Sequence, residues 1–237
     1  MSDYFVFDGI DSRTYGAYTF DAGTDDSPIL QYETQEIPGK SGDLLININR
    51  RQNVEHRYNV IIPSNIDAAF LAMRSALLAV DGYARLEDSI HPNEFYTAYL
   101  GQDIQPTFTL DRDAVKFGLT FLRKPQRWLK SGETATPLTE DGEIVNPTQF
   151  IAKPLLRVYG TGIVGIGSYE FEITQADEYT DIDCEMMECY KDTYAINCNG
   201  NVVFTNYEFP RLHPNSNAVA LGTGITQIDI TPRWYVL

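Results

Sequence analysis

One glycine-rich segment, Gly160-Thr161-Gly162-Ile163-Val164-Gly165, has the glycine spacing of a dinucleotide-binding loop. Such a loop needs a strand before it and a helix after it, so that the pyrophosphate meets a helix N-terminus. Residues 168–173 instead alternate polar and apolar side chains, which predicts a strand. We therefore expect residues 160–165 to connect two strands and to bind no cofactor.

Three carboxylates, Asp181, Asp183 and Glu185, alternate with apolar residues and so share one face of a predicted strand. Calcium sites use such oxygen ligands when a curved loop with a glycine lets them converge, and the sequence lacks that loop. We expect a solvated strand face here.

Cys184, Cys189 and Cys198, with His213, could nominally supply four zinc ligands, but their spacing does not match the paired spacing of zinc sites. We expect the cysteines to be buried thiols. The chain also lacks a nucleophile elbow, a metalloprotease motif and a P-loop. We therefore expect no catalytic residue, no cofactor and no metal; a hydrolase is the enzymatic alternative.

The charge balance argues against nucleic-acid binding, because 33 acidic residues face 18 Lys and Arg, for a net charge of -15. Phosphate binding depends on clustered basic residues. No apolar run approaches the length of a membrane span, and no secretory signal opens the chain, so we expect no membrane insertion. An odd number of cysteines favours synthesis in a reducing cytosol.

Residues 1–130 predict a mainly β domain with one helix. Apolar alternation and turn signals predict strands at residues 4–9, 15–20, 94–100 and 115–122, and a long β-hairpin over residues 43–62 with its turn near residue 51. Helical spacing of apolar residues predicts one helix from Ile66 to Val80, after a cap signal at residues 63–65.

Residues 131–145 lack apolar periodicity and are rich in Gly, Thr, Pro and acidic groups, which predicts a linker. Residues 146–237 predict a β-sandwich, because short strands recur there between Gly, Asn and Pro. The predicted strands cover residues 155–159, 169–174, 180–186, 194–197, 202–205, 218–221 and 225–230.

Several short segments occur in a fixed order along nearly the whole chain: FDGIDS at 7–12 with Tyr15-Gly16, IPGKSGDL at 37–44, FLRKPQRW at 121–128, Asn146-Pro147, Lys153-Pro154, IDCE at 182–185, FPRL at 209–212 and IDITPRW at 228–234. In this order they resemble the distal tail proteins (Dit) of long-tailed bacteriophages. One departure is Asn215, where the family usually has glycine; asparagine tolerates a positive φ better than most residues, so we expect the turn to survive.

The resemblance implies a structural component of a siphophage tail. Its first domain, 1–130, would be a barrel-like or sandwich-like β domain with the helix and the long hairpin, and would form a homohexameric ring on the tail tube. Residues 146–237 would form a galectin-like β-sandwich, with the placement of the last strand left open. The implied partners are the tail tube protein and the tail-tip or baseplate proteins that recognise the host. The implied location is the virion tail tip, after synthesis in the bacterial cytoplasm.

The predicted hairpin has apolar residues on both faces, more than packing on its own domain would need. We therefore expect a subunit interface at Leu44, Leu45, Ile46, Ile48, Tyr58, Val60 and Ile61. Two other functions remain open. The aromatic residues of the second half could form the sugar platform of a carbohydrate-binding adhesin, and the chain could be a tail-tube-type assembly protein that polymerises.

Overall fold

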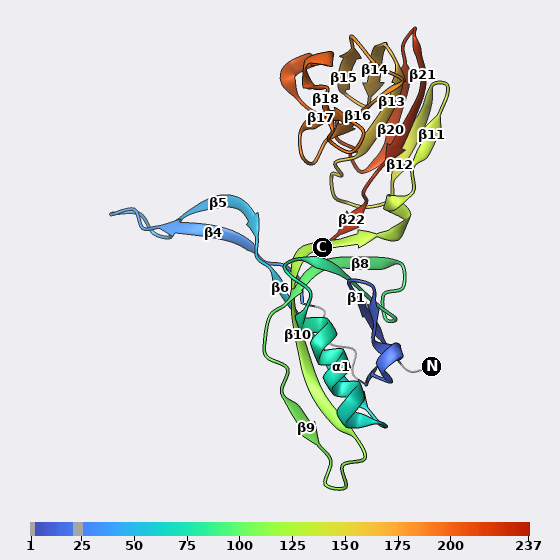
Figure 1. Ribbon diagram of the computed structural model, residues 1–237. Coiled ribbons are helices and arrows are strands. Elements are labelled where there is room, and N and C mark those ends of the chain that lie inside the picture. Colours follow the sequence, from blue (N-terminus) through green and yellow to red (C-terminus); the bar gives the residue numbers. More distant parts are fainter. Residues whose placement is uncertain (1–2, 21–25) are drawn as a thin grey trace. The chain divides into compact units, whose positions relative to one another are not determined.

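The computed structural model describes residues 3–20 and 26–237 and divides the chain into two compact units (Figure 1). The first unit comprises residues 1–127 with Leu237, and the second comprises residues 128–236. Strands dominate both units, and the described part of the chain has one α-helix, α1 (Ile66–Leu78). The predicted fold class, mainly β with one helix, is confirmed.

The main sheet of the first unit is antiparallel, in the order β2-β1-β7-β8-β10-β6-β3, with β9 also paired to β10. Its strands are β1 (Phe5–Phe7), β2 (Ile10–Asp11), β3 (Tyr18–Thr19), β6 (Val54–Ile62), β7 (Ala84–Asp88), β8 (Glu94–Leu100), β9 (Pro106–Phe108) and β10 (Val115–Leu129). A 3₁₀ turn, η1 (Ser12–Tyr15), lies between β2 and β3. Strand β6 alternates strictly between buried and more exposed residues, so one of its faces forms the core.

Helix α1 covers the core face of this sheet. Its buried residues, Ile66, Phe70, Met73 and Leu77, recur at helical spacing and belong to the same apolar cluster as the strands. The rings of Phe70 and Phe117 lie 5.1 Å apart between centroids. The helix predicted from Ile66 is therefore confirmed.

The predicted hairpin over residues 43–62 is wrong. Strand β5 (Leu44–Arg51) pairs with β4 (Leu30–Gln35), whereas β6 pairs with β10 and β3. The reversal between β4 and β5 comes at residues 36–43, where Gly39 and Gly42 adopt φ of 81° and 84°. Strand β6 buries its alternating apolar face in the core, and in this position it pairs with β10 and not with β5.

The second unit is a β-sandwich, as predicted. One sheet has the order β11-β21-β13-β16-β17-β18 and the other β12-β20-β14-β15-β19, and residues of both share one core. The strands are β11 (Thr136–Leu138), β12 (Gly142–Asn146), β13 (Leu155–Gly160), β14 (Gly162–Ile166), β15 (Tyr169–Ile173), β16 (Tyr179–Asp183), β17 (Glu188–Lys191), β18 (Ile196–Asn197), β19 (Val202–Phe204), β20 (Asn215–Leu221) and β21 (Ile225–Thr231). Short 3₁₀ turns are η2 (Lys130–Glu133), η3 (Asn199–Asn201) and η4 (Thr205–Tyr207).

The segment predicted as a linker, 131–145, is part of this sandwich. Strands β11 and β12 form the edges of its two sheets by pairing with β21 and β20. These edge strands are short and carry few buried side chains, which is why their apolar pattern is too weak to read. Asn215 has a φ of 71°, so the turn expected there is present.

The C-terminal strand, β22 (Tyr235–Val236), comes directly after Trp234, a residue of the second unit. Trp234 is buried in the sandwich core, and its carbonyl accepts a hydrogen bond of 2.9 Å from the N–H of Leu129. The N–H of Arg233 donates to the carbonyl of Gly132 at 2.8 Å. Arg233 and Trp234 therefore belong to the second unit, whereas β22 pairs with β10 and Leu237 is grouped with the first unit.

Candidate assembly surface

The glycine-rich segment at residues 160–165 connects β13 to β14, and β15 follows, as predicted. Gly160 and Gly162 have φ of 96° and 140°. A Cβ atom on Gly160 would lie 2.2 Å from the carbonyl oxygen of Gly224. Close approach of two backbones explains these glycines, and the helix that a pyrophosphate would need is replaced by a strand.

Two of the three alternating carboxylates are buried, so the predicted solvated face is wrong for Asp181 and Asp183. Arg157 donates to both oxygens of Asp181, at 2.7 and 2.9 Å, and Arg233 donates to both oxygens of Asp183, at 2.8 Å each. Burial acts to raise the pKa of Asp183, but Arg233 together with the backbone N–H groups of Met186 and Glu185 outweighs it, and the pKa lies below its usual value. Glu185 is exposed.

Cys184, Cys189 and Cys198 are buried free thiols, as predicted. Burial raises the pKa of Cys189 to about 12 and that of Cys184 further. These thiols are therefore protonated at neutral pH, whereas metal ligation and nucleophilic attack require the thiolate. The three cysteines pack the core of the sandwich.

A buried polar cluster lies in the first unit around Asp88. Tyr58 donates to Asp88 at 2.8 Å, and the backbone N–H of His91 donates to the same carboxylate at 2.7 Å. His56 Nε2 lies 3.7 Å from Asp88 Oδ2. Burial acts to raise the pKa of Asp88, but His56, His91 and Tyr58 stabilise the carboxylate and bring its pKa to about 2. The same burial raises the pKa of Tyr58, so neither group exchanges a proton near neutral pH.

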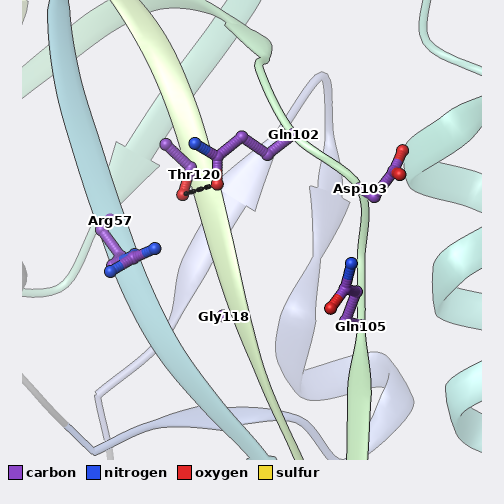
Figure 2. Close-up of a pocket in the computed structure, with 6 residues that line it drawn as sticks. All are labelled: Arg57, Gln102, Asp103, Gln105, Gly118 and Thr120. Carbon is purple, nitrogen blue, oxygen red and sulfur yellow. Dashed lines mark hydrogen bonds between the residues drawn. The ribbon is translucent and has the colours of Figure 1, made fainter.

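A polar hollow of about 570 Å³ lies on the face of β6 and β10 opposite the core. Figure 2 shows Arg57 on β6 and Gly118 and Thr120 on β10. It also shows Gln102, Asp103 and Gln105 on the segment between β8 and β9. The lining residues are Arg57, Gln102, Asp103, Gln105, Gly118 and Thr120. Thr120 donates to Gln102 at 3.3 Å. These six residues include no histidine and no thiol, and they form no nucleophile and base pair.

The hairpin β4–β5 is the most apolar exposed element of the first unit. It forms a separate two-stranded sheet, and in the described part of the chain no third strand joins it (Figure 1). Leu44, Leu45 and Ile46 are consecutive and all exposed, so both faces of β5 present apolar side chains. A two-stranded ribbon is only marginally stable alone, and exposed apolar surface of this kind marks an interaction site.

The seven residues predicted at a subunit interface do not lie together. Leu44, Leu45, Ile46 and Ile48 are exposed on β5, with Leu45 59% exposed. Tyr58 and Val60 are 0% exposed, inside the core of their own unit, and Ile61 is half-buried on β6. Sequence reasoning also missed Ile29 and Tyr32, which are exposed on or beside β4. The signal that could have found Tyr32 is the strand alternation over residues 30–35, and Ile29 lies directly before it.

Comparison with known proteins gives matches among solved structures. No family model and no curated protein matches the sequence. The Dit (gp 19.1) protein of phage SPP1, described as a paradigm of the hub adsorption apparatus in phages that infect Gram-positive bacteria, is 12% identical, with a TM-score of 0.73 and complete coverage of both chains.

Two structures of the phage p2 baseplate in its activated conformation also match. The structure with Ca has a TM-score of 0.51 at 10% identity and 97% coverage of both chains. The structure with Sr has a TM-score of 0.50 at 10% identity, covering 97% of this chain and 98% of the other. The similarity to SPP1 Dit includes both units, so the chain has the fold of that protein.

Proposed function

We propose that this chain, which has the fold of a phage distal tail protein, is a structural tail component that joins the end of the tail tube to tail-tip or baseplate proteins. The observation that carries the proposal is the likeness to SPP1 Dit over the full length of both chains. The buried carboxylates of Asp88, Asp181 and Asp183 are paired with side chains of their own unit, which supports a structural role over catalysis.

The proposed connector is a homohexameric ring at the virion tail tip, assembled from chains made in the bacterial cytoplasm. Support comes from hairpin β4–β5, whose apolar side chains are exposed among the described residues of their own unit. If each subunit packs its hairpin on the next subunit, the contact is heterologous and ends only when the ring closes. The interface is then centred on Leu44, Leu45, Ile46 and Ile48.

Replacing Leu45 with Asp tests this ring. The side chain is exposed in the isolated subunit, so Leu45→Asp leaves the fold and its circular dichroism unchanged. In the ring the same change buries an unpaired charge, which is very costly, so the variant stays monomeric. The matched control is Val145→Asp, which changes an exposed apolar residue on β12 of the second unit and keeps the ring.

Light scattering and electron microscopy, with and without the tail tube protein, read out the assembly state. If Leu45→Asp forms rings to the same extent as wild type, the hairpin contact is refuted. A wild-type chain that stays monomeric in both conditions would refute the ring. Open polymers of wild type would instead favour the tail-tube-type function, because a connector stops at a closed circle.

The carbohydrate-binding alternative has less support from the aromatic residues of the second unit. Phe171, Tyr190 and Trp234 are buried. The ring of Tyr179 has the Arg157 guanidinium 4.1 Å and the Lys191 ammonium 5.3 Å from its centroid. A sugar stacks on an open aromatic face, so these four rings favour packing over sugar binding, whereas Tyr194 and Tyr207 are exposed.

A further inference from the structure

The two sheets of the sandwich end side by side at one edge. Strand β18 is the last strand of the six-stranded sheet, and β19 is the last strand of the five-stranded sheet. Only four residues, Cys198 and the turn η3, separate them along the chain. Residues 186–207, which contain β17, β18, β19 and their turns, therefore form one edge of the second unit; we call this segment the 186–207 edge (Figure 1).

Exposed apolar side chains concentrate on the 186–207 edge. Residues 128–236 have nine large hydrophobic side chains that are exposed, and six of them belong to this edge. These six are Met186, Met187, Tyr194, Ile196, Val203 and Tyr207, whereas the other three are Val145, Ile151 and Ile163. Tyr207 is 97% exposed. Apolar groups gathered in this way mark a surface that another molecule covers.

The backbone of the same edge adopts left-handed conformations that cost free energy for non-glycine residues. Asp192, Thr193 and Tyr194 are consecutive and have φ of 53°, 53° and 68°. Asn206 and Tyr207 have φ of 65° and 58°. Such geometry persists where the surrounding structure enforces it and clusters at functional sites, and here it shapes the two turns that carry exposed tyrosines.

The charge around this edge selects the kind of partner. Residues 158–210 contain ten Asp and Glu and one basic residue, Lys191. Two of the ten, Asp181 and Asp183, are buried and paired with arginines, which leaves eight other acidic residues against one lysine. Lys191 already pairs with Asp177 at 3.1 Å and Glu178 at 3.4 Å. A second copy of this edge, a nucleic acid or an anionic membrane would meet like charge. A basic protein surface would meet opposite charge.

We propose that the 186–207 edge is the docking surface for another protein, through a segment in which Lys or Arg residues flank apolar side chains. The apolar groups of the partner cover Ile196, Val203 and Tyr207, and its cations face the exposed carboxylates Glu188 and Asp192. The identification of this partner as a further tail component rests on the proposed function.

The test uses the full chain and a fluorescein-labelled amphipathic peptide of Lys and Leu, with same-length Lys-Ser and Glu-Leu peptides for comparison. The central variant is Ile196→Ser, and its matched control is Ile163→Ser, because both side chains are 47% exposed and Ile163 lies on β14, away from the edge. Anisotropy gives affinities, and amide hydrogen exchange locates the peptide. The melting temperature of each variant verifies its fold.

We expect the Lys-Leu peptide to bind and to protect amides within residues 186–207. Ile196→Ser weakens this binding by about tenfold, which is the loss expected for one buried apolar side chain, while Ile163→Ser binds like wild type. Equal effects of the two variants overturn the proposal. So does protection outside the edge, or a Lys-Ser peptide that binds as tightly as Lys-Leu, because charge alone then explains the binding.

Ring formation by wild type and Ile196→Ser, measured by light scattering, separates this proposal from the proposed function. Wild-type chains that form no ring but show the expected peptide pattern contradict the connector and leave the docking surface standing. Chains that form rings without that pattern contradict the docking surface alone.

Discussion

The hydroxyl of Tyr58 donates a 2.8 Å hydrogen bond to the carboxylate of Asp88, although β6 and β7 are separated by β8 and β10 in the sheet order. Both side chains are buried. The other oxygen of Asp88 accepts the backbone N–H groups of Ile90 and His91, at 3.0 and 2.7 Å. One carboxylate thus holds the turn after β7 and ties it to the core face of β6.

Asp88 should make the first unit lose stability as the pH falls into the acid range. Its folded pKa of about 2 lies below the unfolded value of about 3.9, so its contribution is present above pH 4 and is lost as the pH falls toward 2. A shift of this size corresponds to about 2 kcal/mol. We expect the free energy of unfolding of wild type to fall by about this amount more than that of Asp88→Asn over this pH range.

Urea unfolding of both proteins at a series of pH values measures this difference. The control is Asp111→Asn, which changes an exposed carboxylate between β9 and β10 and keeps the wild-type profile. If Asp88→Asn and wild type lose stability in parallel as the pH falls, the carboxylate of Asp88 does not carry the dependence.

Arg233 neutralises a carboxylate inside the second unit, and its loss should destabilise that unit. Asp183 is 2% exposed, and Arg233→Met leaves it with backbone N–H donors alone. A broken buried pair costs several kcal/mol, and because Arg233 is partly exposed we expect about 2 kcal/mol. Lys153→Met removes an exposed pair with Glu185 and should cost under about 0.5 kcal/mol.

Chemical denaturation followed by tryptophan fluorescence reports these changes, because both tryptophans, Trp128 and Trp234, belong to the second unit. Equal midpoints for Arg233→Met and Lys153→Met would show that Asp183 does not depend on its guanidinium partner.

Local patterns predicted the elements of this fold better than their pairing. The strict alternation of β6 and the helical spacing of α1 each identify an element and its core face, because both follow from a single buried side. The partner of β5 depends on which of two turns reverses the chain, the one at residues 36–43 or the one near residue 51. That choice is made by the whole core, since β6 buries its apolar face against β10 and leaves β5 to β4.

The candidate surfaces show the same limit. Alternation placed Asp181 and Asp183 on one strand face, but burial depends on Arg157 and Arg233, which lie 24 and 50 residues away in the chain. Likewise, the sequence predicts Tyr58 and Leu45 alike as apolar residues of strands. Tyr58 is buried in the core and Leu45 is exposed, because their strands pair with different neighbours.

The protein should show no measurable binding to duplex DNA at physiological salt. Its net charge is -15, and the longest basic runs are pairs such as Arg50-Arg51 and Arg123-Lys124. Arg123 is buried, so the second pair offers only one exposed cation. DNA binding requires several clustered cations to displace counterions. A clear mobility shift of DNA by micromolar protein would contradict this expectation.

Val60 and Leu45 should respond oppositely to the same substitution. Val60 is 0% exposed and pairs with Phe117 of β10 inside the core, whereas Leu45 is 59% exposed on β5. Val60→Asp puts an unpaired charge among apolar side chains. The cost exceeds the free energy of unfolding of a domain of this size, so we expect the first unit of this variant to be unfolded. Leu45→Asp should keep the wild-type melting temperature and lose only the ring. Calorimetry and light scattering on both variants separate these outcomes. A folded Val60→Asp would contradict the core assignment of β6, and an unfolded Leu45→Asp would show that the hairpin is needed for the fold of its own subunit.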